Sequence, residues 1–482
     1  MRVHLVAVAG TGMGALAGLF KAMGHEVSGS DTAFYPPMGP ALERWGIRLE
    51  TGFDPKHLDP APDLVVVGNV CRPHNPEARA AIDGGMRVSS MAHALGELAL
   101  EGRSPLVVGG THGKTTTSAM CAHVLHVAGL DPGFLIGGLP KNFETSFRVP
   151  GPRRLAALGS QAQKRKTPFV VEGDEYDTAF FEKTPKFWHY RPEVGIITSV
   201  EHDHIDIYPD AASYDAAFSG FVGRLPESGL LVASAHDAHV IAIARAAKCE
   251  LAFYALGGDD THGAPPHWLA EPVAGTNEFD LFVGGVSAGR SRLAVPGEHN
   301  LRNALAALAA CCQGFGVSVK TALAALETFA GVRRRQDLLY VASGISVYDD
   351  FAHHPTAVRE TLAALRQKHP TGALWAVFEP RSATACRSLH QAEYESSFDS
   401  AERVLFAPLG RSDIPEAERL DLERISRAIG DRGGRAEVAS SVDDIIATIA
   451  RDAGPGDTVA LLSNGAFGGI YEKLRVALEK RT

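Results

Sequence analysis

The chain has 482 residues, of which 45% are hydrophobic and 21% are charged, a composition typical of packed globular cores rather than of a disordered protein. Its formal net charge of −9 at pH 7 disfavours a general nucleic-acid-binding protein, because affinity for phosphate backbones comes mainly from clustered Lys and Arg. No apolar run approaches the roughly 20 residues that a membrane-spanning helix needs, so we expect no membrane span.

The first residues show no sign of export. MRVHLVAVAGTGMG runs from an apolar strand pattern directly into a glycine turn, without the small-residue cleavage site of a signal peptide. The six cysteines form no CxxC pair and no zinc-ligand spacing. We therefore expect a cytoplasmic protein with reduced thiols.

Short β-branched runs alternate with helical patterns throughout, which indicates an α/β fold with mostly parallel sheets. At roughly 150 residues per domain the length suggests three domains. We place the first over residues 1–104, with strands at 3–9, 26–31 and 63–69; the second over 105–330, with strands at 105–110, 168–174 and 194–200; and the third over 331–482, with strands at 345–350, 374–379, 403–408 and 458–463. The segment 151–166 carries five cations, Arg153, Arg154, Lys164, Arg165 and Lys166, and we interpret it as a solvated loop rather than a binding patch. Its residues 153–166 look like an insertion.

A glycine turn follows the first predicted strand. Gly10, Gly12 and Gly14 precede a helix, and Asp31 lies about 20 residues further on, which resembles a dinucleotide-binding fingerprint with altered final spacing. The turn suits a diphosphate at a helix N-terminus, or it is a strand–helix connection that needs small residues. Both interpretations stay open at this point.

The second glycine turn is more specific. Gly110-x-x-Gly113-Lys114-Thr115 is a shortened P-loop, because Val108 occupies the position of the first glycine in the strict pattern. Its glycines allow backbone amides to surround phosphates, Lys114 adds a positive charge, and the Thr115 hydroxyl can bind Mg²⁺.

Two acidic clusters follow later strands of the same domain, at 172–175 (EGDE) and 201–206 (EHDHID). Ligands of open α/β sheets bind beyond the carboxyl ends of the strands. We therefore expect the P-loop and both clusters to meet at one edge, as a nucleotide and metal site.

Further polar groups lie in the second and third domains. His299 and Asn303 share one helical face and could contact an adenine or complete a capping network. The run 333–335 (RRR) is either solvated or supplies a bidentate contact to phosphate. The segments 379–382 (EPRS) and 463–469 (SNGAFGG) follow strands and offer donors suited to a substrate that bears a carboxylate.

The set of motifs resembles the Mur ligase family along all three domains. The motifs occur in the family's order as GTHGKTTT (110–117), VEGDEYD (171–177), SVEHDHIDIY (199–208), PGEHNLRN (296–303), RRRQD (333–337) and YDDFAHHPTAV (348–358). The resemblance implies an N-terminal Rossmann-like domain that holds a UDP-sugar, a central P-loop ATPase and a C-terminal Rossmann-like domain that binds the peptide substrate and closes over ATP. It also implies formation of an amide bond in peptidoglycan precursors, with ATP and Mg²⁺ bound and ADP released.

The resemblance also implies residue roles. The expected catalytic residues are Lys114, His204 and Glu172, and the expected Mg²⁺ ligands are Thr115, Glu172 and His204. The expected ATP-binding residues are Gly110, Thr111, His112, Gly113, Lys114, Thr115, Thr116, His299, Asn303, Arg335 and Asp350. The expected substrate-binding residues are Gly12, Met13, Gly14, Ser30, Asp31, His353, Arg381 and Ser463. Lys248 is the first lysine after His204, so the carbamylated lysine of several family members has no evident counterpart.

Segments such as HEVSGSD (25–31), FEPRS (378–382) and SNGAFGGI (463–470) resemble the family branch that joins UDP-N-acetylmuramate to the tripeptide L-alanyl-γ-D-glutamyl-meso-diaminopimelate in peptidoglycan recycling. The branch that adds L-alanine to UDP-N-acetylmuramate in de novo synthesis is the alternative. A P-loop regulator that hydrolyses ATP and senses a nucleotide sugar is an alternative of another class. The sequence predicts no nucleic-acid or membrane partner and leaves the oligomeric state and the third peptide residue open. It also leaves open the general base, which could be His204, His353 or Glu201.

Overall fold

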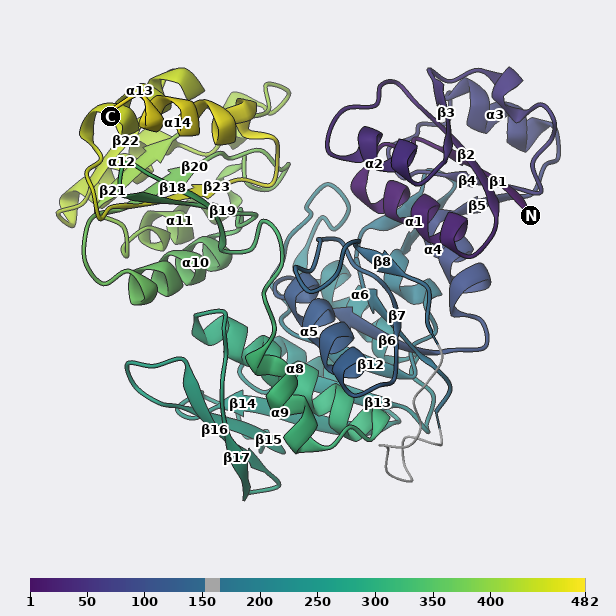
Figure 1. Ribbon diagram of the computed structural model, residues 1–482, viewed down its shortest axis with the longest axis horizontal. Coiled ribbons are helices and arrows are strands. Elements are labelled where there is room, and N and C mark those ends of the chain that lie inside the picture. The colour runs from purple at the N-terminus through teal and green to yellow at the C-terminus, as the bar shows by residue number, and fades with distance from the viewer. Residues whose placement is uncertain (152–164, 482) are drawn as a thin grey trace.

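The computed structural model describes residues 1–151 and 165–481, so most of the basic segment 153–166 lies outside the described residues. The chain forms three α/β units, and the first and the third both lie against the central one (Figure 1). The predicted fold class, α/β with mostly parallel sheets, is confirmed. The exact division of the chain after residues 104 and 330 stays a prediction.

The first unit contains a parallel five-stranded sheet. The strands lie in the order β3 (Arg48–Thr51), β2 (Glu26–Asp31), β1 (Arg2–Val6), β4 (Leu64–Val67), β5 (Val88–Ser90), and the α-helices are α1 (Thr11–Ala22), α2 (Met38–Arg44), α3 (Pro76–Asp83) and α4 (Met91–Leu95). β1 and β4 are buried along almost their whole length, as the apolar runs predict for strands covered on both faces.

The central unit contains a ten-stranded sheet. Its strand order is β17 (Val286–Arg292), β16 (Glu278–Val283), β15 (Trp268–Pro272), β14 (Glu250–Leu256), β13 (Leu230–Ser234), β12 (Val194–Ile197), β6 (Ser104–Gly109), β9 (Pro168–Glu172), β7 (Gly133–Leu135), β8 (Phe147–Arg148), and its helices are α5 (Lys114–Val127), α6 (Ala211–Val222), α7 (Ala238–Ala244), α8 (Glu298–Phe315) and α9 (Val319–Glu327). The strands from β15 to β7 are parallel, and β16, β17 and β8 are antiparallel additions at the edges. β9 and β12 end earlier than the sequence predicts, because the chain turns there into the acidic segments.

The third unit contains a six-stranded sheet. Its strand order is β18 (Asp337–Ala342), β19 (Ile345–Asp350), β23 (Thr458–Leu462), β20 (Leu374–Phe378), β21 (Arg403–Phe406), β22 (Arg435–Val438), and only β18 is antiparallel to its neighbour. The helices α10 (Pro355–Lys368), α11 (Gln391–Ser397) and α12 (Leu422–Asp431) pack on one face, and α13 (Val442–Asp452) and α14 (Ile470–Glu479) on the other.

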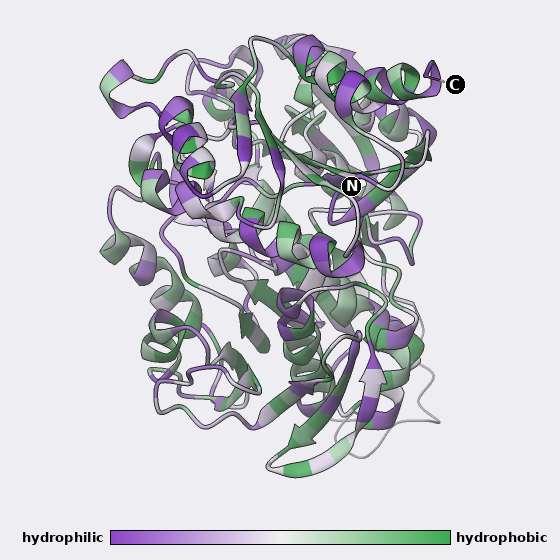
Figure 2. Cartoon of the chain, turned by 90° about the vertical axis from the view of Figure 1, so that its left-hand side faces the viewer, coloured by the Kyte–Doolittle hydropathy of each residue, from purple (hydrophilic) through white to green (hydrophobic). Residues whose placement is uncertain are grey.

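The hydrophobic cores show how the units are joined. One core runs from α1 of the first unit through β6, β9 and β12 of the central unit, and Trp45 meets Phe147 edge to face at 4.8 Å across this boundary. The third unit has two cores of its own, one on each face of its sheet. Interior strands are mostly green in the hydropathy view, whereas many helices carry both colours (Figure 2). Among the described residues, no helix combines the length and apolar character that a membrane span requires.

We predict that Leu308→Ala destabilises the central unit by about 2–5 kcal/mol, because Leu308 on α8 is fully buried and the truncation leaves a cavity. Leu338 on β18 is 42% exposed, so Leu338→Ala should change stability by no more than about 0.5 kcal/mol. Denaturant unfolding followed by circular dichroism measures both; equal losses would contradict the assigned core.

Candidate active site

Two glycines of the P-loop are required because neighbouring side chains pack directly against the backbone of the loop. Gly110 has a φ of +137°, and a Cβ there would collide with the Thr198 hydroxyl in the loop after β12. Gly113 has a φ of +80°, and a Cβ there would collide with the Asn303 side chain on α8. The turn therefore brings the N-terminus of α5 against two other elements, and the unpaired N–H groups of that terminus favour an anion.

Lys114 begins α5 and is held by a buried carboxylate. Its ammonium lies 2.9 Å from Glu175, whose side chain is only 1% exposed, and it also donates to the carbonyl oxygen of Gly110 at 2.5 Å. Burial would lower the pKa of Lys114, but the carboxylates of Glu175 and Asp174 outweigh it and hold that pKa above the usual value. Lys114 is therefore a fixed positive charge at the start of the helix.

The Glu175 carboxylate also binds His204, which lies in the loop after β12. His204 Nε2 lies 3.1 Å from Glu175 Oε1, and its Nδ1 lies 3.7 Å from Asp203. Burial opposes protonation of this imidazole, but the hydrogen bond to Glu175 and the charge of Asp203 raise the pKa of His204 above its usual value. Glu175 thus joins the loops that follow β6, β9 and β12.

Thr115 and Glu172 form a pair beside Lys114. The Thr115 hydroxyl donates to Glu172 Oε1 at 2.9 Å, and the backbone N–H of Gly137 donates to Glu172 Oε2 at 2.7 Å. Hydroxyl and carboxylate oxygens are ligands that Mg²⁺ prefers, so this pair fits the predicted metal. His204 faces the same cavity but bonds to Glu175 rather than to Glu172.

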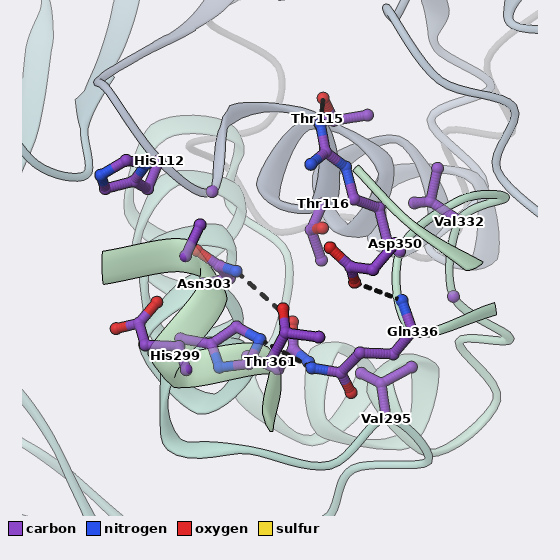
Figure 3. Close-up of a pocket in the computed structure, with 16 residues that line it drawn as sticks. His112, Thr115, Thr116, Val295, His299, Asn303, Val332, Gln336, Asp350 and Thr361 are labelled. Atoms are coloured by element: carbon purple, nitrogen blue, oxygen red, sulfur yellow. Dashed lines mark hydrogen bonds between the residues drawn. The ribbon is translucent and has the colours of Figure 1, made fainter. Parts of the chain in front are cut away.

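A pocket between the central and third units contains eight of the eleven predicted ATP-binding residues, whereas Thr111 and Lys114 line a larger cavity next to it and Gly110 lines neither. It is lined by His112, Gly113, Thr115, Thr116, His299, Asn303, Arg335 and Asp350, together with Gln336 and other residues (Figure 3). The Gln336 backbone N–H donates to Asp350 at 2.7 Å, and its side-chain amide lies 3.0 Å from His299 Nε2. The structure thus brings the P-loop, α8 and the turn before β18 to one pocket.

A larger neighbouring cavity of about 460 Å³ is lined by all three units. The first unit contributes Gly12, the third unit Arg335 and His353, and the central unit the residues Thr111, Lys114, Glu172 and His204. A ligand in this cavity can therefore contact the first glycine turn, the P-loop and the third unit together.

The other predicted residues of the first unit lie inside it. Met13, Gly14 and Ser30 are buried, and a Cβ on Gly14 would collide with Met38, so close packing against α2 explains this glycine. Asp31 accepts hydrogen bonds from the backbone N–H groups of Ala9 and Thr32 and so braces the glycine turn. Of the five residues predicted to bind the sugar nucleotide, only Gly12 lines the large cavity.

Arg381 and Ser463 lie together at the carboxyl ends of β20 and β23. Ser463 is fully buried, donates to Glu379 and accepts from the Gly465 N–H at 2.9 Å. The Arg381 side chain is 48% exposed and runs against Gly465. Neither residue lines the two cavities above.

The sequence did not predict the role of Glu175, and it pointed to Glu201 only as a candidate general base, not as a contact between the central and third units. Glu201 accepts from Thr356 of the third unit at 2.7 Å and lies 3.4 Å from His112 and 3.6 Å from His354. Burial would raise the pKa of Glu201, but these partners lower it to about 2. Both residues lie in acidic clusters that the sequence shows, but their partners are distant in the chain.

Three family models match successive parts of the chain: "Mur ligase family, catalytic domain" over residues 2–103, "Mur ligase middle domain" over 108–311 and "Mur ligase, glutamate ligase domain" over 334–465. The UDP-N-acetylmuramate–L-alanyl-γ-D-glutamyl-meso-2,6-diaminoheptandioate ligase of Escherichia coli K12 is 37% identical, over 100% of this chain and 99% of that protein. The UDP-N-acetylmuramate–L-alanine ligase of Kineococcus radiotolerans is 38% identical, over 84% of this chain and 80% of that protein. The crystal structure of a murein peptide ligase from Psychrobacter arcticus 273-4 matches with a TM-score of 0.73 and 36% identity, over 99% of each chain.

The turn that contains Arg334 and Arg335 contacts a buried carboxyl group, so its structure can be tested through the pH dependence of the free energy of unfolding. Arg334 donates to Asp349 at 3.2 Å, and burial raises the pKa of Asp349 from 3.8 to about 6. The pKa of this carboxyl group is higher in the folded than in the unfolded protein. Its contribution to stability is therefore fully present at pH values below the unfolded-state pKa, and it is lost as the pH rises through the folded-state pKa. The free energy of unfolding of the wild type should therefore fall by about 2 kcal/mol relative to Asp349→Asn between pH 4 and pH 7. Denaturant titrations at each pH measure this difference; a constant or widening advantage of the wild type would contradict it.

Proposed function

Because the chain belongs to the Mur ligase family, whose members are ADP-forming ligases, we propose that it joins UDP-N-acetylmuramate to L-alanyl-γ-D-glutamyl-meso-diaminopimelate with ATP and Mg²⁺. The full-length likeness to relatives named for this reaction supports the choice of substrates. The observation that carries the proposal is the cavity shared by all three units, which Lys114, Glu172 and His204 line. We also propose the cytoplasm as its location, since ATP and nucleotide sugars are made there.

The proposed roles follow the geometry. The triphosphate lies along the P-loop and Arg335, with the nucleoside between α8 and Asp350. Thr115 and Glu172, with His204 nearby, are the proposed holders of Mg²⁺, which when bound would neutralise phosphate charge. Gly12 contacts the sugar nucleotide at the other side of the cavity, and Arg381 and Ser463 face the incoming peptide.

The proposed reaction has two steps. A carboxylate oxygen of the sugar acid forms a bond to the γ-phosphorus, the bond from that phosphorus to the bridging oxygen breaks, and ADP leaves. The amine of the peptide then attacks the acyl carbon, its proton passes to a base, and phosphate leaves. The chain supplies mainly orientation and fixed positive charge, as in other phosphoryl transfers.

We propose His353 as the base among the three candidates. Its Nδ1 lies 3.0 Å from the carbonyl oxygen of Phe351, which can only accept, so Nδ1 carries the proton and Nε2 the lone pair. Burial lowers the pKa of His353, which keeps this lone pair free at neutral pH. His204 Nε2 is already bonded to Glu175, and the Glu201 carboxylate is occupied by Thr356 and His112.

The amino substrate is tested by offering ATP, Mg²⁺ and UDP-N-acetylmuramate with either the tripeptide or L-alanine. We expect mass spectrometry to show the tripeptide adduct and ADP release that needs both substrates. An L-alanine adduct alone would favour the reaction of the Kineococcus relative, and ATP hydrolysis unaffected by either substrate would favour a sensor.

Lys114→Ala should lower the rate of ligation at least about 100-fold. It deletes the fixed positive charge that we propose to lie next to the transferred phosphoryl group. Lys183→Ala is a matched control, since Lys183 is 65% exposed and pairs only with Asp177 among the described residues. ADP release with both substrates saturating is the measurement. Near-normal turnover by a folded Lys114→Ala protein would refute the P-loop assignment.

Arg381→Ala should raise the KM for the peptide by about tenfold and leave the KM for ATP nearly unchanged, because the half-exposed Arg381 guanidinium is the group that we propose to pair with the peptide carboxylate. Steady-state kinetics with each substrate varied in turn measure both constants. Equal increases for peptide and ATP would exclude the proposed carboxylate contact.

A further inference from the structure

Lys186 is fixed at the edge of the large cavity by its own backbone. It begins the short helix η4 (Lys186–His189), which follows the hairpin of β10 (Asp177–Ala179) and β11 (Glu182–Pro185). The Lys186 N–H donates to the carbonyl oxygen of Tyr176 at 3.0 Å, and the Phe187 N–H donates to that of Asp174 at 3.2 Å. The Phe187 ring is fully buried, so η4 is anchored to the acidic segment after β9.

The Lys186 side chain ends beside a carboxylate. Its ammonium donates to Asp174 Oδ2 at 2.6 Å, lies 5.7 Å from the centre of the Tyr176 ring, and belongs to a side chain that is only 12% exposed. Asp174 also accepts from the Tyr176 N–H at 3.1 Å through its other oxygen. An ammonium has three N–H groups, so a bond to Asp174 leaves two for a ligand.

The lysine and arginine side chains that line the cavity differ in their contacts. In the described part of the chain, Lys114, Lys186 and Arg335 are the lysine and arginine residues that line it. Lys114 starts the P-loop helix, and Arg335 donates to Thr115 at 3.3 Å, so both belong to the phosphate side. Lys186 does not line the pocket that contains most of the predicted ATP-binding residues.

Lys186 lines the cavity together with residues of the first unit and of the P-loop. On one side, η4 packs against the first unit, where a Cβ on Gly96 would lie 2.7 Å from the carbonyl oxygen of His189. On the other side, Asp174 contributes to the charge environment of Lys114. Gly12 and Met91 of the first unit line the same cavity.

We propose that Lys186 binds the carboxylate of the sugar acid and directs it at the γ-phosphorus, with Asp174 as the positioning residue. This inference rests on the proposed function. The carboxylate oxygen forms the new bond to phosphorus while the bond to the bridging oxygen breaks and ADP leaves, and Lys186 transfers no proton. Its charge offsets the repulsion between the carboxylate and the triphosphate, which a cavity lined by Glu172 and Asp174 would otherwise increase.

The test compares Lys186→Met, Lys186→Arg and the control Lys183→Met, which removes the same charge from the neighbouring strand β11. Binding of UDP-N-acetylmuramate and of UDP-N-acetylglucosamine, which lacks the carboxylate, is measured by calorimetry without ATP. KM values for the sugar nucleotide, ATP and peptide are measured in parallel.

We expect Lys186→Met to weaken UDP-N-acetylmuramate binding and raise its KM at least tenfold, with the KM for ATP changed less than twofold. Binding of UDP-N-acetylglucosamine should be unchanged, Lys186→Arg should recover part of the affinity, and Lys183→Met should behave as wild type. The double variant Asp174→Asn/Lys186→Met, which leaves no unpaired charge, should show the same selective loss if the single variant folds poorly.

Wild-type affinity for UDP-N-acetylmuramate in a folded Lys186→Met protein, or equal losses for both sugar nucleotides and ATP, would overturn the inference. If the wild type ligates normally in that case, the proposed function stands and only the role of Lys186 fails. If the wild type neither binds UDP-N-acetylmuramate nor forms the adduct, both fail.

Discussion

The candidate active site depends on one buried carboxylate, that of Glu175. Lys114 lies at the N-terminus of α5, where the helix dipole and burial both disfavour a positive charge. Glu175 offsets this cost and holds His204 as well. This requires that the loops after β9 and β12 both reach the loop after β6, which the strand order β12-β6-β9 provides. The positions of Lys114 and His204, two of the proposed catalytic residues, thus follow from sheet topology.

The units are joined to one another in different ways. The first and central units share a hydrophobic core, which packs the element that carries the first glycine turn against the sheet that carries the P-loop. The third unit meets the P-loop edge through polar contacts, including Glu201 with Thr356 and Arg335 with Thr115. Polar interfaces are typical of domains that move relative to one another. Motion of the third unit would change the distance of Arg335 and His353 from the P-loop.

The sequence predicted the local features of this architecture well. Gly110, Gly113 and Lys114 lie within one short segment, which is why their pattern predicts a phosphate-binding loop. Runs of β-branched residues likewise predict buried strands such as β6. The pocket that unites His299, Asn303 and Asp350 was expected from the resemblance to a family, and the structure places them together. The functional roles of these residues stay predictions.

Other features depend on contacts between distant segments, which spacing does not reveal. Nothing local distinguishes Glu175, which pairs with Lys114, from Asp174, which pairs with Lys186. Gly14 looks like part of a phosphate-binding turn, yet packing against Met38 accounts for it. Strands β9 and β12 are shorter than predicted because the chain leaves the sheet to form the site.

A crystal structure with Mn²⁺ in place of Mg²⁺ and a non-hydrolysable ATP analogue tests the central claim most directly. We predict triphosphate density along residues 110–115, the adenine between α8 and the third unit, and an anomalous metal peak beside Thr115 and Glu172. A nucleotide bound elsewhere, or a metal remote from both side chains, would contradict the claim that these loops form one ligation site.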